Sequence, residues 1–494
     1  MKTKNKVIIY ALVLIASFLI MLFSVGLATF AQLSSSGIEF NFVTNGGNQL
    51  ERITVQDGEI IELPVPVREN HAFEGWFFDE ALESAFSLQG LTFGRFRTVN
   101  LYAGWFTGLN VTFNTNGGNT LDNVIAIEVQ DMDLPVPHRA GWAFTGWYTD
   151  NALTDRFNAS QVQLTRDTQP VTLHASWVEP RAFSSWADFT ANASAENIAF
   201  SIDLTTADAN AEMVLGIAPN VLSVTLTGNA QTQLNGLRIT VAPGRTQPVV
   251  INLDSINMQG GQPIFSGAWN RAGRMHLNFS GQSRILAGQG SDAVRGGFIT
   301  INSFGITEII GGVGRAGDDN SSNNAESRRG HDGSHGVRAF GDVVITGTGT
   351  TVWGGNGGRG GRRTPASDTH RDNRVGGTGG TGGHAVFADG SVEVEGAVLN
   401  GGNGGIGGVG GWASTGAFPP ATHADGGNGG TGGNGGNAIR ASAITVTGDG
   451  VVLNGGAGER GGTGGGSSNA FGASGRDGSA GASGQNGAAQ FIII

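Results

Sequence analysis

The chain has 494 residues, of which 85 are glycine and only 14% are charged, and its formal net charge is −11 at pH 7. An acidic chain without a long basic block argues against binding nucleic acid through its phosphates. The absence of cysteine excludes disulfide bonds, thiolate metal sites and a lipid anchor on cysteine. Because glycine costs backbone entropy on folding, such a chain needs a repeated backbone pattern to become ordered.

The N-terminus has the features of an export signal. Three lysines among the first six residues precede an apolar stretch that runs from residue 7 to about residue 31. Cleavage after Ala31 is one interpretation. The run is also long enough to span a bilayer, so residues 1–31 are either a signal peptide or an uncleaved N-terminal membrane anchor. The positive residues before the run keep the N-terminus inside and place the rest of the chain outside.

Two copies of one pattern follow. Four landmarks recur after 71 residues, or after 72 in the last pair: Gly46 and Gly117, Pro64 and Pro135, Trp76 and Trp147, and Trp105 and Trp177. A single period shared by four landmarks indicates tandem domains. We place these domains at residues 37–107 and 108–178.

The same residues have a physical interpretation. Asn45-Gly46 and Asn116-Gly117 are hairpin-turn sequences that supply positive φ angles. We interpret the four tryptophans, together with Phe73 and Phe144, as the cores of two small domains. Stacking of a tryptophan or of Tyr148 on a carbohydrate is the alternative.

Two short polar segments, Asp79-Glu80 and Asp150-Asn151, lie at corresponding positions in the two domains. The two residues of each segment are adjacent in the sequence, and neither aspartate has a distinct second carboxylate as a catalytic partner. We interpret them as turn caps rather than as catalytic residues.

The repeated pattern resembles the Listeria–Bacteroides repeat, the InlB B-repeat of Gram-positive and related surface proteins. The resemblance covers the TNGG turn, the LP.P step, the F.GW run and the closing LYA.W strand, and so nearly all of residues 37–178. It implies two small β-grasp-like domains, rich in strands, that serve as spacers or adhesive modules on the cell envelope. The first copy departs from the second at Glu74 and Phe77, and has Gly104 where a lysine is common, without an expected effect on the fold.

The composition changes at Glu179-Pro180. Residues 184–189 suit a short capping helix with Ser185 as its N-cap, and apolar strands follow. Leu226 and Leu253 are 27 residues apart, and Leu253 and Leu277 are 24 apart. This is the length of one compact coil of a right-handed parallel β-helix, so residues 181–310 are predicted to form a cap and compact coils. By pattern, this part resembles the pectate-lyase-like β-helix region of bacterial adhesins.

Four later stretches repeat one another around a marker aliphatic residue, with steps of 43, 49 and 53 residues. The markers are Val294, Val337, Val386 and Ile439. The strands are kept and the loops vary, which is the behaviour of a repeat unit. A unit with two strands of about four or five residues cannot bury its apolar face alone, so we predict that residues 311–494 continue the solenoid. Alternation in Val392 to Glu395 predicts valines inward and glutamates outward.

A polar residue stands two positions before each marker, and stacked coils would place these residues in register: Asp292, His335, His384 and Asn437. The main interpretation is a polar ladder that satisfies backbone groups at a corner of the coil. The alternative is a metal or catalytic site.

Glycine-rich loops join the later coils, for example at residues 354–361, 401–411 and 426–436. A GGX triplet has the period of an extended helix with three residues per turn, and such helices can pack side by side with glycine at the contacts. With 13 prolines in the chain, the loops are not collagen. They also lack the GK[ST] of a phosphate loop and the regular aspartates of a repeats-in-toxin calcium site, because Asp318-Asp319 and Asp425 are isolated.

No catalytic, cofactor-binding or metal-ligating residue is predicted. Loop histidines could suggest zinc, but their spacing is irregular: His331, His335, His370, His384 and His423. No serine nucleophile elbow is present, and the strand-borne acids Asp254, Glu393 and Glu395 are either far apart in the coils or point outward singly.

We therefore predict a mainly β, exported protein of the cell envelope or cell surface, not an enzyme, with a structural and adhesive role. Its expected partners are an extracellular glycan or a host or matrix protein, and the cell wall or membrane through its N-terminus. A polysaccharide lyase or hydrolase on the β-helix is the alternative. A third class, an ice-facing or purely structural protein, would need a flat threonine-bearing face, for which Thr378, Thr381 and Thr431 are few. Because Phe491 to Ile494 resembles the first strand of a further coil, we expect a truncated C-terminus.

Overall fold

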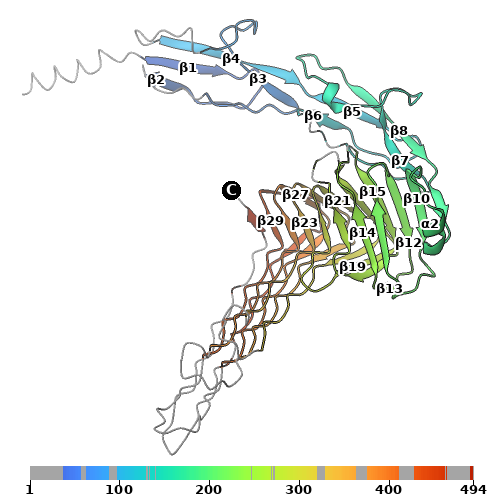
Figure 1. The fold of residues 1–494 in the computed structure, drawn as a ribbon. Helices are drawn as coiled ribbons and strands as arrows, with labels where there is room; N and C mark the ends of the chain where they lie inside the picture. Colours follow the sequence, from blue (N-terminus) through green and yellow to red (C-terminus); the bar gives the residue numbers. More distant parts are fainter. Residues whose placement is uncertain are drawn as a thin grey trace, which may run out of the picture. The chain divides into compact units, whose positions relative to one another are not determined.

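The computed structural model of the chain is mainly β (Figure 1). It describes residues 37–56, 63–87, 97–128, 132, 134–139, 141–245, 247–268, 270, 273–319, 329–362, 375–410, 428–461, 463, 485 and 490–492. The predicted export segment at residues 1–31 lies outside the described residues. Within the described residues, no helix is long and apolar enough to span a bilayer.

The first repeat forms a four-stranded sheet with the order β2-β1-β4-β3. Its strands are β1 (Gly37–Val43), β2 (Ile53–Gln56), β3 (His71–Phe77) and β4 (Arg97–Thr107). The two central strands are parallel and the two outer pairs are antiparallel. This mixed sheet agrees with the β-grasp-like fold that the resemblance implies.

The second repeat builds the same sheet in the order β6-β5-β8-β7. Its elements are β5 (Leu109–Asn114), β6 (Val124–Ala126), β7 (Ala143–Tyr148), the short helix η2 (Ala159–Gln161) and β8 (Val171–Val178). Strands β5 and β8 are parallel, as are β1 and β4 in the first copy. The 71-residue period is therefore a repeat of structure.

The turn interpretation is confirmed in both domains, and the core interpretation is confirmed for three of the four tryptophans. Asn45 and Gly46 have φ angles of 49° and 92°, and Asn116 and Gly117 have nearly the same values. The core of the first sheet contains Trp76 and Trp105, each 6% exposed, with Phe73 packed against them. Trp147 is also buried. These three tryptophan rings lie in the cores and are not free to stack on a carbohydrate. Trp177, whose Nε1 donates to the carbonyl oxygen of Thr115, and Tyr148 are only partly buried.

Asp79 and Asp150 are turn caps, as expected. Asp79 accepts hydrogen bonds from the backbone N–H groups of Glu83 and Ser84, and Asp150 accepts from those of Thr154 and Asp155. These bonds hold the pKa of both carboxyl groups below the usual value, led by the N–H of Glu83 in the first case and of Asp155 in the second.

A capping element precedes the coils. It consists of β9 (Arg181–Phe183) and helix α2 (Trp186–Asn192). Ser185 is the N-cap, and its hydroxyl accepts a hydrogen bond from the N–H of Asp188 at 3.1 Å. The ring of Phe189 stacks on Phe200 with centroids 5.2 Å apart. The predicted capping helix and N-cap are thus confirmed, and the cap covers the first coil.

The rest of the chain forms a solenoid of three parallel sheets, and each complete coil gives one strand to each sheet (Figure 1). In the first sheet β9 is followed by β10 (Ala199–Asp203), β12 (Ser223–Thr227), β15 (Val249–Asp254), β18 (Met275–Ser280), β21 (Ile299–Ser303), β24 (Val343–Thr346), β27 (Ser391–Glu395) and β30 (Ala443–Thr447). The second sheet contains β11 (Met213–Ile217), β14 (Leu237–Val241), β17 (Ile264–Ser266), β20 (Val294–Gly296), β23 (Val337–Ala339), β26 (Val386–Ala388), β29 (Ile439–Ala441) and β32 (Gln490–Ile492). The third contains β13 (Gln233–Leu234), β16 (Asn257–Gly260), β19 (Gln282–Ala287), β22 (Ile306–Ile310), β25 (Thr350–Trp353), β28 (Val398–Asn400) and β31 (Val452–Asn454).

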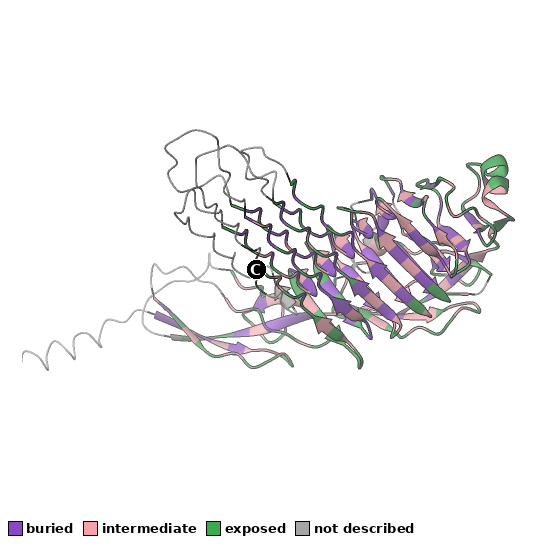
Figure 2. Cartoon of the chain, turned by 90° about the horizontal axis from the view of Figure 1, so that it is seen from below, coloured by how far each residue is buried: buried purple, intermediate pink, exposed green. Residues whose placement is uncertain are grey.

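Aliphatic side chains fill the space between the three sheets. One continuous core extends from Phe183 to Ala441, and Figure 2 shows buried and exposed residues alternating along the strands. In β27, Val392 and Val394 are fully buried while Glu393 and Glu395 are exposed, as the alternation predicts. The mainly β solenoid is therefore confirmed, whereas the exact domain boundaries stay predictions.

The predicted register is correct for the later coils and needs correction elsewhere. The marker residues Val294, Val337, Val386 and Ile439 pair successively. Leu226 pairs with Leu253, but Leu253 pairs with Phe279 and not with Leu277. Leu277 and Phe279 of β18 are both buried, and the prediction used Leu277, which is not the residue that pairs with Leu253. The unit also has three strands, not two. The prediction missed the strand in the second sheet, which is three residues long in the later coils.

The glycine loops run out from the third sheet and return to the second. We call residues 311–319, 354–362, 401–410 and 455–461 the outgoing segments, and residues 329–336, 375–384 and 428–437 the returning segments. The outgoing segments form one layer and the returning segments form another. The first glycine of a triplet donates within its own layer, as the N–H of Gly357 does to the carbonyl oxygen of Asn403 at 2.8 Å. The second donates across layers, as Gly358 does to His331 at 2.8 Å.

The third residue of each triplet faces solvent. Asn356, Arg359 and Arg362 are exposed, while the glycines between them are mostly buried. A Cβ atom on Gly358 would lie 1.9 Å from the carbonyl oxygen of Arg315. The expected side-by-side packing of GGX segments with glycine at the contacts is therefore confirmed.

Candidate functional site

The polar ladder exists as predicted. The Oδ1 atom of Asp292 accepts a hydrogen bond from the N–H of His335 at 2.9 Å. The Nδ1 atom of His335 accepts from the N–H of His384 at 3.0 Å, and Nδ1 of His384 accepts from the N–H of Asn437 at 2.9 Å. Each side chain thus satisfies the backbone N–H of the next coil. This is the structural role that the main interpretation assigned to it.

The environment of the ladder keeps its histidines neutral. The two imidazole rings are stacked with centroids 5.1 Å apart and are nearly parallel, with an interplanar angle of 2°. Burial, aided by the positive charges of Arg338, Arg440 and Arg295, lowers the pKa of His335 to about 4. Burial and the neighbouring His335 lower the pKa of His384 to about 3. Since Nδ1 accepts, the proton of each neutral ring is on Nε2.

The ladder does not have the composition of a metal site. Among the residues that the structure describes, no three His, Asp or Glu side chains lie close enough together to hold a metal ion. His331 is exposed in a returning segment, while His370 and His423 lie outside the described residues, as does Asp425. Asp318 is exposed, and Asp319 is paired with Arg359 at 2.8 Å.

The strand-borne acids that an enzyme would need are not brought together. Asp254 is on β15 and Glu393 and Glu395 are on β27, four strands away in the same sheet. The hydroxyl of Ser255 donates to Asp254, whereas the two glutamates are exposed. Asp254 is thus coils apart from the two glutamates, which face outward on β27, as the alternation predicted.

Beside the ladder lies a second column that the sequence analysis did not identify. We define the arginine–phenylalanine column as the middle residues of five successive strands of the second sheet: Phe265, Arg295, Arg338, Phe387 and Arg440. The residues on both sides of each middle position are buried, so the column faces outward. The signal in the sequence was a Val-Arg or Ile-Arg pair at three of the four markers.

Aromatic rings support the guanidinium groups of the column. Arg338 lies over Phe387 at 5.4 Å and over Phe340 at 5.7 Å, and Arg295 lies over Phe340 at 5.4 Å. Arg440 lies over Phe387 from 5.2 Å. Cation–π contacts of this kind hold the planar groups in fixed positions.

A depression of about 300 Å³ opens where the ladder meets the column, and we call it the corner pocket. Its lining consists of Gln262, Gly290, Ser291, Asp292, Arg295, Asp332, Gly333, Ser334, His335 and Arg338. Asp292 is 7% exposed, and its burial raises its pKa against the opposing effects of the His335 N–H and of the two arginines. Positive, negative and neutral polar groups therefore converge at one place.

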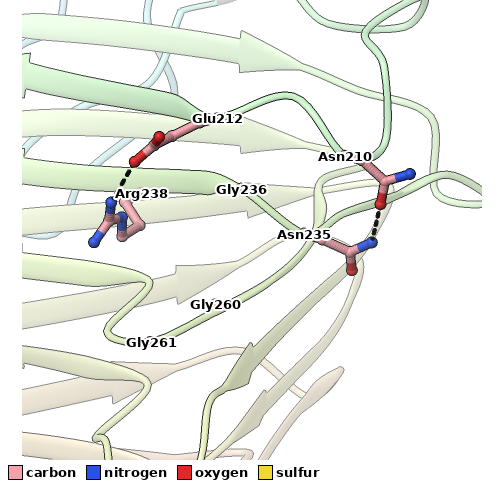
Figure 3. A pocket seen from close by; sticks show the side chains of 7 residues that line it. All are labelled: Asn210, Glu212, Asn235, Gly236, Arg238, Gly260 and Gly261. Carbon is pink, nitrogen blue, oxygen red and sulfur yellow. Dashed lines mark hydrogen bonds and ion pairs between the residues drawn. The ribbon is translucent and has the colours of Figure 1, made fainter.

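A second depression of about 320 Å³ lies near the start of the same sheet (Figure 3). There the Nη2 atom of Arg238 contacts the carboxylate of Glu212 at 2.9 Å, and Asn235 donates to Asn210 at 3.1 Å. The charges of this second depression are paired with each other, in contrast to the arginines of the corner pocket.

Comparisons with known proteins identify the two N-terminal repeats. Residues 39–103 and 110–176 match the Listeria-Bacteroides repeat domain, so the chain contains two copies of it. A protein of Evansella cellulosilytica named "Putative membrane protein" is 32% identical over 140 residues, which is 28% of this chain and 20% of the relative. Another from the same organism, "Putative Gly-rich membrane protein", is 32% identical over 151 residues, 30% of this chain and 17% of the relative.

The chain thus spans about a fifth of the length of these relatives. No solved structure matches the chain. The comparisons support the repeat domains and leave the solenoid to be interpreted from its own residues.

Proposed function

We propose that this protein is exported to the cell envelope, where it acts as a structural and adhesive protein rather than as an enzyme. The observation that carries the proposal is the regular outward display of side chains along the solenoid and on both layers of glycine segments. A backbone that is hydrogen-bonded at every triplet presents these side chains in fixed positions. Such a surface suits binding to an extended partner.

The repeat domains and the relatives support the location. The two Listeria–Bacteroides repeats suit a role as spacer modules of a surface protein, and both relatives carry membrane-protein names. The apolar N-terminal segment supplies either the export signal or an anchor. An extracellular glycan or a host or matrix protein is the proposed partner.

The test is fractionation of the producing cells with an antibody against residues 181–494, followed by protease treatment of intact cells. We expect a signal in the envelope fraction that the protease removes, while a cytoplasmic marker protein survives. Protein found only in the cytoplasm would overturn the proposal.

The alternative is a polysaccharide lyase or hydrolase carried on the solenoid. Release of the protein into the medium, together with depolymerisation of a polysaccharide by the purified chain, would favour it. Asp254 lies four strands away from Glu393 and Glu395 in the same sheet, so these three strand-borne acids do not form one catalytic cluster.

A further inference from the structure

Two neighbouring arginines of the column make no ion pair with any carboxylate that the structure describes. Arg295 and Arg338 pair directly on adjacent parallel strands, which lie about 4.8 Å apart. Like charges placed directly opposite one another are destabilising. Among the described residues, no carboxylate lies within ion-pair distance of either guanidinium, and the Nε atom of Arg295 has no hydrogen-bond partner.

Other arginines of the solenoid differ in this respect. Arg238 pairs with Glu212 at 2.9 Å and Arg284 pairs with Glu308 at 3.1 Å, in each case across neighbouring strands. The chain therefore has acidic residues that neutralise arginines elsewhere on its coils. The adjacent pair in the corner pocket is left for a group from outside, in a protein whose formal net charge is −11.

The nearest acids are already engaged. Asp292 is buried and its Oδ1 accepts the N–H of His335. The Oδ1 atom of Asp332 accepts the N–H of Thr381 at 2.8 Å, and its carboxylate contacts Arg329 at 3.2 Å. These acids keep free lone pairs, so they can accept hydrogen bonds from hydroxyl groups of a ligand.

We propose that the corner pocket binds a carboxylate-bearing sugar of an acidic glycan, with its carboxylate on Arg295 and Arg338 and its hydroxyl groups on Asp332 and Ser291. The planar guanidinium groups, held by Phe340 and Phe387, offer the forked donors that match a carboxylate. A volume of about 300 Å³ is at the small end of ligand sites and admits a sugar ring.

The mixture of charges favours this ligand over a nucleic acid. Nucleic acids are bound through a row of cationic contacts to successive phosphates, whereas this lining offers two arginines beside two aspartates. A sugar acid needs one cationic contact and several hydroxyl partners, which is what the lining supplies. The inference rests on the proposed binding role and names its ligand class.

The experiment uses the full chain purified in detergent and a fluorescent hexasaccharide of alternating glucuronate and N-acetylglucosamine. The matched probe is the same oligosaccharide with its carboxylates reduced to hydroxymethyl groups. Binding is measured by fluorescence polarisation for the wild type and for Arg295→Gln, Arg338→Gln and Arg238→Gln. The last variant removes an arginine of the same sheet whose charge is already paired.

We expect the acidic probe to bind at least about tenfold more tightly than the reduced one, because hydrogen bonds between ionised groups are stronger than those between neutral groups. Arg295→Gln and Arg338→Gln should each weaken binding by about tenfold or more, and Arg238→Gln should leave it unchanged. Circular dichroism checks that the variants keep the fold.

Equal binding of the two probes, an equal loss in Arg238→Gln, or no binding by the wild type would each overturn the inference. The cell fractionation is read independently of these measurements. A surface-exposed protein that binds neither probe would refute the sugar-acid site and leave the envelope location intact, whereas a cytoplasmic protein would refute the location.

Discussion

At the scale of single residues, the polar ladder shows how a repeated position can serve the backbone. In the three later coils, the N–H group of the residue two positions before the marker points to the preceding coil. Asp292, His335 and His384 each accept that N–H from the next coil. Aspartate and neutral histidine with an unprotonated Nδ1 are interchangeable here, because both supply an acceptor atom to the N–H of the next coil.

The ladder predicts loss of stability in mild acid. The folded-state pKa values of about 4 for His335 and about 3 for His384 lie below the ordinary value of 6.5. Above pH 6.5 both the folded and unfolded states are neutral, so the stability is fully present. As the pH falls from 6.5 toward 4 and 3, only the unfolded state takes up protons, and the free energy of unfolding falls by up to about 1.4 kcal/mol per pH unit for each ring.

The measurement is urea unfolding between pH 7 and pH 4 for the wild type and for the double variant His335→Asn and His384→Asn. Asparagine occupies the corresponding position 437 in the next coil, and its side-chain oxygen can accept a hydrogen bond without titrating. The variant should lose less stability over this range than the wild type. Identical pH profiles would contradict a role for the two imidazoles.

At the scale of elements, the glycine segments depend on the missing Cβ atom at two of every three positions. Inner glycines touch the backbone of neighbouring segments, and the exposed third position tolerates Asn, Arg, Thr, Ile or Val. The layers are held by hydrogen bonds and close contact instead of apolar side chains. This explains how a chain with so much glycine becomes ordered.

Gly358→Ala should therefore loosen the glycine segments. The new Cβ would meet the carbonyl oxygen of Arg315, so we expect a destabilisation on the order of 3 kcal/mol. Hydrogen exchange at Gly355, Gly358 and Gly380 reports it, as faster exchange in the variant. Ile406→Ala, a change at an exposed third position, is the control and should alter these rates little.

The capping helix gives a second prediction at this scale. Ser185→Ala removes the hydroxyl that accepts the N–H of Asp188, and should destabilise the cap by about 1 kcal/mol. Ser185→Gly should cost only about a few tenths of that amount. Chemical unfolding followed by the fluorescence of Trp186 measures both. A larger effect for glycine than for alanine would contradict the N-cap.

At the scale of the whole molecule, the solenoid is a stack in which each coil contacts its neighbours. The first coil would expose the backbone of β10 and the ring of Phe200 without β9 and α2. Open sheet edges of this kind pair with other chains. The cap therefore protects the solenoid as well as stabilising it.

Deleting residues 181–192 should increase self-association of the chain. The exposed edge of β10 offers unpaired N–H and C=O groups, so sedimentation velocity should show concentration-dependent oligomers that the intact chain does not form. The Ser185→Ala variant retains β9 and is the control. Unchanged sedimentation after the deletion would show that the edge is protected in another way.

The sequence by itself determined the tandem repeats, the turns at Asn45 and Asn116, the cap with Ser185 and the register of the four markers. These features are local or recur at a measurable step, so a pattern reveals them. The register of the ladder followed directly, because its residues stand at a constant distance from the markers. The packing of the GGX segments followed from their period of three.

Only the tertiary structure decided the rest. The three-residue strands of the second sheet are too short to show alternation, so the third strand of each coil was missed. The pairing of Leu253 with Phe279 depended on which of two inward side chains faces the neighbour. Arg295 and Arg338 are 43 residues apart, with a glycine loop of variable length between them. Their meeting became visible only when the coils were stacked, because charge repulsion between two side chains depends on their distance in space.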